Sequence, residues 1–153
     1  MHKILFVCLG NICRSPMAES IFRHKVQQAG LGDHFQIGSA GTGDWHVGQL
    51  PDSRTIEVLK VNGITDVSRA RQVIANDFVD FDHLIAMDLA NVRDLHRWDR
   101  SVPDVVSLMS SWNPASTVLE IPDPYYGNEQ DFHHVFALLD KGCEGLLNKL
   151  KNS

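Results

Sequence analysis

Short apolar runs alternate with amphipathic stretches along the chain. The run at 3–7 is apolar and β-branched without polar alternation, which is typical of a strand buried on both faces of a parallel sheet. Runs bounded by turn residues predict strands at 3–7, 35–40, 83–87 and 117–121. Apolar positions at helical spacing, with capping and stop residues, predict helices at 16–30, 52–63, 88–95 and 129–150.

This alternation defines the expected fold class. Strands separated by helical segments imply right-handed crossovers, so we expect a single α/β domain over residues 1–153, with a four-stranded parallel sheet and helices on both faces. Ligands bind such folds at the carboxyl ends of the strands. The loops after Val7, Ala40 and Ile121 are predicted to leave from that edge.

Composition and charge narrow the functional classes. The formal net charge is −5 and no basic run is present, which argues against a nucleic-acid or anionic-membrane partner. No signal-like segment and no apolar run of membrane-spanning length is seen, so we expect a cytoplasmic protein. Three cysteines do not suggest a secreted disulfide framework, and the eight histidines show no metal-ligand spacing, so we expect no metal and no cofactor.

The stretch 7–16, Val-Cys-Leu-Gly-Asn-Ile-Cys-Arg-Ser-Pro, carries the chemistry. Pro16 suits a first helical position, which places the loop at a strand-to-helix junction. Backbone N–H groups at a helix N-terminus lack helical partners and add to the positive end of the dipole, so an anion belongs there. We therefore predict a phosphate-binding nucleophile loop formed by Leu9, Gly10, Asn11, Ile12, Cys13, Arg14 and Ser15.

Each residue type in this loop suits one task. Cys8 lies at the mouth of the positive loop, which stabilises its thiolate as a nucleophile. Arg14 presents a planar fork that can hold two phosphoryl oxygens at once. Ser15 can donate its hydroxyl to the sulfur. Gly10 and Asn11 tolerate the left-handed backbone that such a loop is expected to need.

Two motifs together resemble one enzyme family. Cys-x5-Arg-Ser at 8–15 and Asp-Pro-Tyr-Tyr-Gly at 123–127 are similar to motifs of the low-molecular-weight protein tyrosine phosphatases, and the resemblance covers essentially the whole chain. It implies hydrolysis of phosphotyrosine on proteins through a cysteinyl-phosphate intermediate, with inorganic phosphate or other oxyanions as inhibitors. Expelling phenoxide needs a proton. Asp123, held between two prolines, matches the family's general acid, and its carboxylate would then activate water.

Other residues are interpreted from their expected positions around the phosphate-binding loop. Trp45, Tyr125 and Tyr126 lie on loops predicted to overhang the phosphate site, so we interpret them as aromatic walls that select phosphotyrosine; packing aromatics are the alternative. Asn11 and Ser39 are expected to form a hydrogen bond that supports the loop.

The other cysteines and charged residues are interpreted in part through relatives. In relatives the thiol equivalent to Cys13 can form a disulfide with the nucleophile, which makes Cys13 the expected redox partner; filling the loop's rim is the alternative. Cys143 lies on the apolar stripe of the last helix and is expected in the core. Asp88 is interpreted as a helix cap, and Arg69 and Arg71 as a solvated face.

Three other functions are weighed against phosphotyrosine hydrolysis. Arsenate reduction in this fold needs shuttle cysteines, and none lies between Cys13 and Cys143. Phosphoarginine phosphatases of the family tend to carry threonine where this chain has Ile12. A non-catalytic phosphate or redox sensor would not need the combination of Cys8, Arg14 and Asp123.

Overall fold

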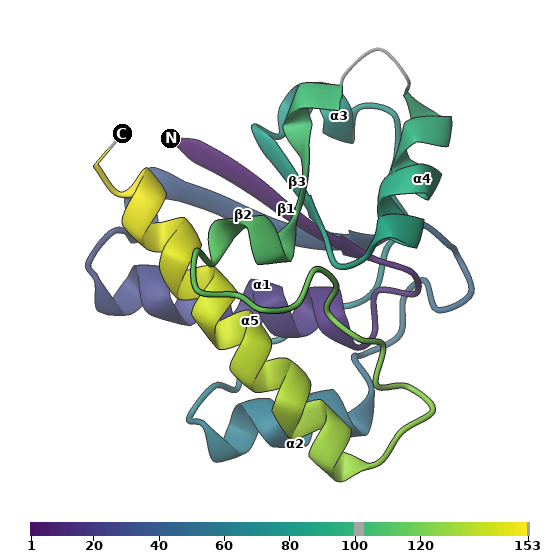
Figure 1. The fold of residues 1–153 in the computed structure, drawn as a ribbon, viewed down its shortest axis with the longest axis vertical. Helices are drawn as coiled ribbons and strands as arrows, with labels where there is room; N and C mark the ends of the chain where they lie inside the picture. Colours follow the sequence, from purple (N-terminus) through teal and green to yellow (C-terminus); the bar gives the residue numbers. More distant parts are fainter. Residues whose placement is uncertain (100–102, 153) are drawn as a thin grey trace.

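Four parallel strands form the sheet of the computed structural model, which describes residues 1–99 and 103–152 (Figure 1). The strands are β1 (His2–Cys8), β2 (Phe35–Gly41), β3 (His83–Ala86) and β4 (Val106–Leu108). Their order is β2-β1-β3-β4, and each neighbouring pair is parallel. β1 is therefore a central strand. The α/β fold with a four-stranded parallel sheet, expected from the sequence, is confirmed.

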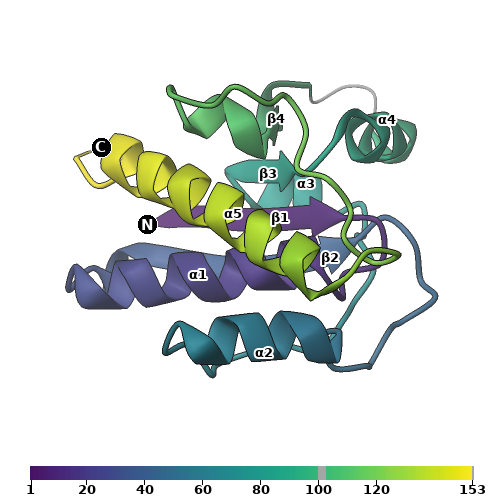
Figure 2. The ribbon, with the colours of Figure 1, turned by 60° about the horizontal axis from the view of Figure 1, so that its bottom comes forward.

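Helices cover both faces of this sheet (Figure 2). They are α1 (Arg14–Gln28), α2 (Ser53–Val61), α3 (Asp77–Asp80), α4 (Leu89–Trp98) and α5 (Glu129–Leu150). α1 and α5 pack on one face with α2 outside them, and α3 and α4 lie on the other face. Short 3-10 helices lie at Gly32–His34, Pro103–Val105 and Met109–Trp112.

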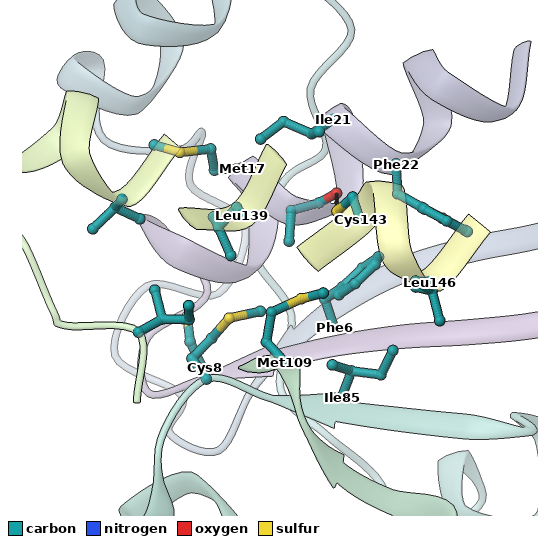
Figure 3. Close-up of a cluster of buried hydrophobic side chains, with 14 of the residues drawn as sticks. Phe6, Cys8, Met17, Ile21, Phe22, Ile85, Met109, Leu139, Cys143 and Leu146 are labelled. Carbon is teal, nitrogen blue, oxygen red and sulfur yellow. Dashed lines mark hydrogen bonds between the residues drawn. The ribbon is translucent and has the colours of Figure 1, made fainter. Parts of the chain in front are cut away.

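The two faces of β1 contribute to two apolar clusters. Ile4, Phe6 and Cys8 belong to the larger cluster with α1 and α5, whereas Leu5 and Val7 belong to the smaller cluster with α3 and α4. Figure 3 shows side chains of β1, β3, α1 and α5 meeting in the larger cluster. Burying one large apolar side chain stabilises the fold by about 1.5–3 kcal/mol. Because Cys8 is the last member of the β1 series, the core also fixes the position of its sulfur.

The fourth strand is not where the sequence pattern placed it. Residues 117–121 form no strand, and β4 is Val106–Leu108 instead. The apolar run misled because Val118 and Leu119 are exposed rather than packed in a core. Ile121 is buried, and its N–H donates to the carbonyl of Met87, just after β3, at 2.9 Å. This contact brings the following loop, residues 122–127, to the carboxyl edge of the sheet.

Most helix boundaries follow the capping residues. α5 has the predicted bounds, Glu129–Leu150. Asp52 and Asp88 are the N-cap residues of α2 and α4, and each carboxylate accepts a backbone N–H of the first turn. α1 begins at Arg14, two residues earlier than predicted. Arg14 is therefore held by a helix that packs on the core.

Candidate active site

The loop 9–13 connects the carboxyl end of β1 to the N-terminus of α1. Within the part of the chain that the structure describes, the backbone N–H groups of residues 9–15 donate to no protein acceptor. The positive end of the α1 dipole lies at the same place. The loop therefore offers a set of free hydrogen-bond donors to an anion.

Asn11 gives this loop its shape. Its φ of 57° lies in the left-handed region, which costs a non-glycine residue roughly 1 kcal/mol. The side chain is held by three contacts: Nδ2 donates to Ser15 Oγ at 2.7 Å and to Ser39 Oγ at 3.0 Å, and Oδ1 accepts the N–H of Arg71 at 3.0 Å. The hydrogen bond expected between Asn11 and Ser39 is thus present, and these contacts offset the backbone strain.

The expectation that Gly10 adopts a left-handed backbone is wrong. Gly10 has no positive φ, and a Cβ there would make a tight contact, 3.0 Å from Cδ2 of the His46 side chain. Gly41, which sequence reasoning missed, is more constrained. A Cβ on Gly41 would lie 2.9 Å from the carbonyl oxygen of Leu9, so the glycine lets the end of β2 pack directly on the loop.

Cys8 lies at the bottom of the loop. Its sulfur is 3.0 Å from Ser15 Oγ, and the residue is 3% exposed. The Ser15 hydroxyl also accepts the Asn11 amide at 2.7 Å, so its own hydrogen is directed elsewhere and can point at the sulfur. The first turn of α1 therefore places a hydroxyl donor beside the thiol.

Arg14 is a buried guanidinium between two carboxylates. Its Nη1 donates to Asp88 Oδ2 at 2.7 Å and to the carbonyl of Ile121 at 2.9 Å, and its Nη2 lies 3.6 Å from Asp123 Oδ2. Burial acts to lower the pKa of Arg14, but the charge of Cys8, the hydrogen bond to Asp88 and the charge of Asp123 outweigh it and raise that pKa. Arg14 therefore stays charged in the core.

Asp88 has a second contact beyond the predicted cap. One carboxylate oxygen accepts the N–H of Asn91 at 2.8 Å, as a cap does, and the other accepts Arg14. Asp88 and Arg14 are 74 positions apart in the chain. No local sequence signal connects them, which is why sequence reasoning missed this pair.

Asp123 reaches the site from the irregular segment after Ile121, not from the end of a strand as expected. Its Oδ1 accepts the N–H of Tyr125 at 3.1 Å, and its side chain is 41% exposed. The Arg14 contact with Ile121 anchors the start of this segment. Asp123 is thereby placed at the solvent side of the same cavity as Cys8.

A cavity of about 330 Å³ joins these groups. It is lined by Cys8, Leu9, Gly10, Ile12, Cys13, Arg14, Trp45, His46, Asp123, Tyr125 and Tyr126. The three predicted wall aromatics are among them, and the rings of Tyr125 and Tyr126 meet edge to face at 4.9 Å. His46 was not predicted; its Nδ1 lies 3.0 Å from Gln49 Oε1. Apolar walls thus surround a charged floor.

Buried polar side chains support the loop from behind. Glu19 accepts the hydroxyls of Ser39 at 2.5 Å and Ser68 at 2.7 Å, and it pairs with Arg23. Sequence reasoning missed Glu19, because a carboxylate within a helix gives no sign of burial. Ser68 supplies its hydroxyl to the same carboxylate.

Arg69 is exposed and the Arg71 side chain is 40% exposed, as expected for a solvated face, but both residues also make contacts within the fold. The Arg71 guanidinium makes two hydrogen bonds to the buried carboxylate of Asp77, at 2.9 and 3.1 Å, while its backbone holds Asn11. Arg69 Nη1 donates to the carbonyl of Gly48 at 2.9 Å. Both residues therefore fasten loops around the cavity.

The other two cysteines, Cys13 and Cys143, lie in different parts of the molecule. Cys13 is buried against the cavity, and burial followed by the charges of Asp52, Cys8 and Asp123 raises its pKa. Cys143 is fully buried in the large apolar cluster, as predicted, and burial raises its pKa as well (Figure 3). Both are therefore neutral thiols at pH 7.

Across 1–99 and 103–152, no three His, Cys, Asp or Glu side chains are grouped so as to hold a metal ion. No helix in those ranges has the length and apolar character needed to cross a bilayer.

Taken together, the fold and site define an α/β protein with a cysteine and an arginine in a cavity at the carboxyl edge of a parallel sheet. Residues 3–153 match the family model described as low molecular weight phosphotyrosine protein phosphatase. The chain belongs to this family of phosphoric monoester hydrolases.

Relatives and solved structures are similar to this chain over nearly its full length. The low molecular weight phosphotyrosine protein phosphatase of Schizosaccharomyces pombe is 47% identical over 150 residues, covering 97% of this chain and 96% of the relative. A protein tyrosine phosphatase from Entamoeba histolytica, solved with Hepes in the active site, has a TM-score of 0.94 and 40% identity, covering 99% of this chain and 98% of that one. The Drosophila arginine phosphatase has a TM-score of 0.89 and 34% identity, covering 97% and 98%.

Proposed function

We propose that this protein hydrolyses phosphotyrosine on proteins, with Cys8 as the nucleophile, Arg14 and the loop amides as the phosphate site, and Asp123 as general acid and base. One observation carries the proposal. The Cys8 sulfur, 3.0 Å from a hydroxyl donor, lies in the same cavity as free amides, Arg14 and Asp123.

In the first half-reaction the phosphoryl oxygens take hydrogen bonds from the amides of residues 9–15 and from Arg14. The Cys8 sulfur attacks phosphorus, an S–P bond forms, and the P–O bond to the tyrosyl oxygen breaks. The carboxylic acid form of Asp123 gives its proton to that oxygen, so a neutral phenol leaves. Asp123 is suited to this because it sits at the solvent side of the cavity, 3.6 Å from Arg14 Nη2.

In the second half-reaction water replaces the phenol. The Asp123 carboxylate takes a proton from the water, whose oxygen attacks phosphorus as the S–P bond breaks. Inorganic phosphate forms and the Cys8 thiolate departs. The Ser15 hydroxyl stabilises that thiolate by a hydrogen bond to sulfur. Arg14 and the amides stabilise the transferring group in both steps without a metal.

The cavity walls account for the choice of substrate. Trp45, Tyr125 and Tyr126 form aromatic walls above the phosphate site, against which a substrate ring can stack. We expect a phosphotyrosine to bring its phosphorus to the sulfur between these walls, and the shorter phosphoserine to leave its phosphorus out of reach. Tyrosine-phosphorylated proteins are therefore the proposed partners, and inorganic phosphate and related oxyanions the proposed competitive inhibitors.

Phosphoarginine hydrolysis is the second candidate, and the relative named as an arginine phosphatase supports considering it. Ile12 lines the cavity with an apolar branched side chain. This surface favours an aromatic ester over a guanidinium, so phosphotyrosine remains the preferred substrate. Arsenate reduction is disfavoured because Cys143, the thiol that would have to serve as a shuttle, is fully buried in the core.

The reaction also constrains the redox environment. Cys8 must be reduced, outside any disulfide, for its thiolate to attack, which fits a reducing compartment such as the cytoplasm. Cys13 lines the same cavity and is the proposed partner for a protective disulfide with Cys8.

A substrate panel with one variant tests the proposal. The protein is assayed for phosphate release from matched peptides bearing phosphotyrosine, phosphoserine or phosphoarginine, and for arsenate reduction. Phosphotyrosine is expected to be preferred by kcat/KM. Cys8→Ser is expected to lose turnover while still binding inorganic phosphate. Full activity of Cys8→Ser, or a preference for another substrate, would overturn the proposal.

A further inference from the structure

The N-terminus of α2 contacts both loops of the cavity. On one side, the N–H of Asp52 donates to the carbonyl of Ile12 at 2.8 Å, within the phosphate loop. On the other side, Arg54 Nη2 donates to the carbonyl of Tyr125 at 2.9 Å and its Nη1 to that of Gly127 at 3.1 Å. The first turn of α2 therefore links the phosphate loop to the loop 122–127, which carries Asp123.

The Arg54 side chain is itself fixed. Its Nε and Nη2 donate to the two carboxylate oxygens of Asp52 at 3.0 and 2.9 Å, a two-point contact that sets the plane of the guanidinium. That plane lies over the ring of Phe132, with 4.3 Å from the guanidinium carbon to the ring centre. Arg54 thus reaches the carbonyls from a rigid support.

The loop 122–127 has few other attachments. Within it, the N–H of Tyr125 donates to Asp123 Oδ1 at 3.1 Å and that of Gly127 to the carbonyl of Pro124 at 2.8 Å. Among the described residues, the hydrogen bonds that reach 122–127 from the rest of the chain all come from Arg54. The Arg14 to Asp123 ion pair, at 3.6 Å, is longer than a hydrogen bond.

These contacts form a relay to the acid. Arg54 holds the carbonyl of Tyr125, and the N–H of the same residue holds the Asp123 carboxylate. We propose that Arg54 is a positioning residue for the proton transfer: it keeps Asp123 above the phosphate site without touching the substrate. This inference rests on the proposed role of Asp123 as general acid.

The proposal has a specific kinetic consequence. As the P–O bond breaks, the proton of the Asp123 carboxylic acid moves to the leaving oxygen. Releasing the loop lowers the fraction of molecules in which Asp123 is in place, so transfer to a strongly basic oxygen slows. A weakly basic nitro-substituted phenolate leaves without that proton, and phosphate binding by the loop 9–13 is unaffected.

The test compares Arg54→Met and Arg54→Lys with Arg97→Met, a control that removes an arginine on α4 whose side chain is 78% exposed. kcat/KM is measured for phenyl phosphate and for a dinitrophenyl phosphate, with the inhibition constant of inorganic phosphate. For Arg54→Met we expect kcat/KM to fall roughly tenfold with phenyl phosphate and less than about threefold with the nitro ester. The tenfold loss is a small part of the rate acceleration that a general acid supplies. Arg54→Lys is expected to recover part of the loss, and the phosphate inhibition constant to stay within about twofold.

Four results would overturn the inference. Equal losses of kcat/KM on both esters would indicate general structural damage. No loss on either ester would show that Arg54 does not contribute to the proton transfer. When Asp123 is already replaced by alanine, adding Arg54→Met is expected to cause no further loss of kcat/KM that is larger for phenyl phosphate than for the nitro ester. If the leaving-group-dependent losses of the two single variants instead add in the double variant, the positioning role is contradicted. If Asp123→Ala alone shows no dependence on the leaving group, the proposed general acid fails and the positioning role fails with it.

Discussion

The sulfur of Cys8 lies 3.0 Å from the hydroxyl oxygen of Ser15, across the turn that joins β1 to α1. The two residues are only seven positions apart, so this contact is set by the local geometry of the loop rather than by distant packing. It connects the proposed nucleophile to the first turn of a helix that is buried against the core.

Ser15→Ala removes the hydroxyl donor to the sulfur. A hydrogen bond to a charged group contributes about 1.5–3 kcal/mol, so we expect kcat to fall by roughly ten- to a hundredfold. Ser20→Ala is the matched control, because Ser20 is a buried serine of the same helix that bonds the carbonyl of Asp66 at 2.7 Å instead. Steady-state kinetics that leave Ser15→Ala at wild-type kcat would remove the hydroxyl from the proposed mechanism.

Asp123→Ala removes the proposed proton donor. We expect a loss of about 10²–10⁴ in kcat/KM for phosphotyrosine, and a much smaller loss for a nitro-substituted aryl ester, whose phenolate leaves without a proton. Asp33→Ala, in the 3-10 helix Gly32–His34, serves as the control. Similar losses for the two esters in Asp123→Ala would argue against the assignment.

The Cys8–Cys13 disulfide is predicted to depend on pH. Peroxide oxidises the Cys8 thiol to a sulfenic acid, and attack by the Cys13 sulfur then forms the S–S bond and releases water. Because burial raises the pKa of Cys13, its side chain is a thiolate in only a small fraction of protein molecules at neutral pH. That fraction grows with pH, so we expect the disulfide to form faster as pH rises from about 6 to 9.

Mass spectrometry of peroxide-treated protein measures this disulfide. Cys13→Ser is expected to accumulate the sulfonic acid of Cys8 instead, and Cys143→Ser to retain the disulfide, since Cys143 lies in the core. A wild-type spectrum containing only the sulfonic acid of Cys8 at every pH would rule out protection by Cys13.

Asp52 is expected to make folding stability depend on acid pH. Hydrogen bonds from the Arg54 side chain outweigh burial and lower the pKa of the Asp52 carboxyl. A lowered folded-state pKa contributes stability above the unfolded value of about 3.9, and that stability is lost as pH falls through the folded value. At pH 7 we therefore expect Asp52→Asn, which keeps a capping side chain, to lower the free energy of unfolding by about 1 kcal/mol.

Urea unfolding at several pH values checks this dependence. The difference between wild type and Asp52→Asn is expected to begin to shrink near pH 4, where the carboxyl of the unfolded chain takes up a proton, and to disappear only below the lowered pKa of the folded chain. Asp33→Asn provides an aspartate on an exposed 3-10 turn for comparison. A difference that stays constant from pH 7 to about pH 2.5 would contradict the ion-pair origin of the stability.

Local patterns were enough for the parts of the molecule that depend on neighbours in the chain. The uninterrupted apolar run before Cys8 predicted a strand buried on both faces, and β1 is such a strand. The amphipathic repeat of α5 predicted its bounds and the burial of Cys143. These features follow from periodicity and capping, which act over a few residues.

Local patterns failed where apolar residues do not pack. The run 117–121 has strand-like composition, yet Val118 and Leu119 face solvent, because the edge of β3 is already taken by β4. β4 itself has three half-buried residues, too few to show a period. Strand pairing therefore had to be read from the three-dimensional arrangement.

By itself, then, the sequence determined the strand, loop and helix that present Cys8, Arg14 and Ser15, because those residues are neighbours and their conformations depend on short-range sterics and hydrogen bonds. Tertiary structure alone decided that Asp88 meets Arg14 and that Arg54 holds Tyr125, across 74 and 71 positions of the chain. Such contacts depend on how whole helices pack on the sheet, and the order of polar and apolar residues along the chain does not specify which polar side chains that packing brings together.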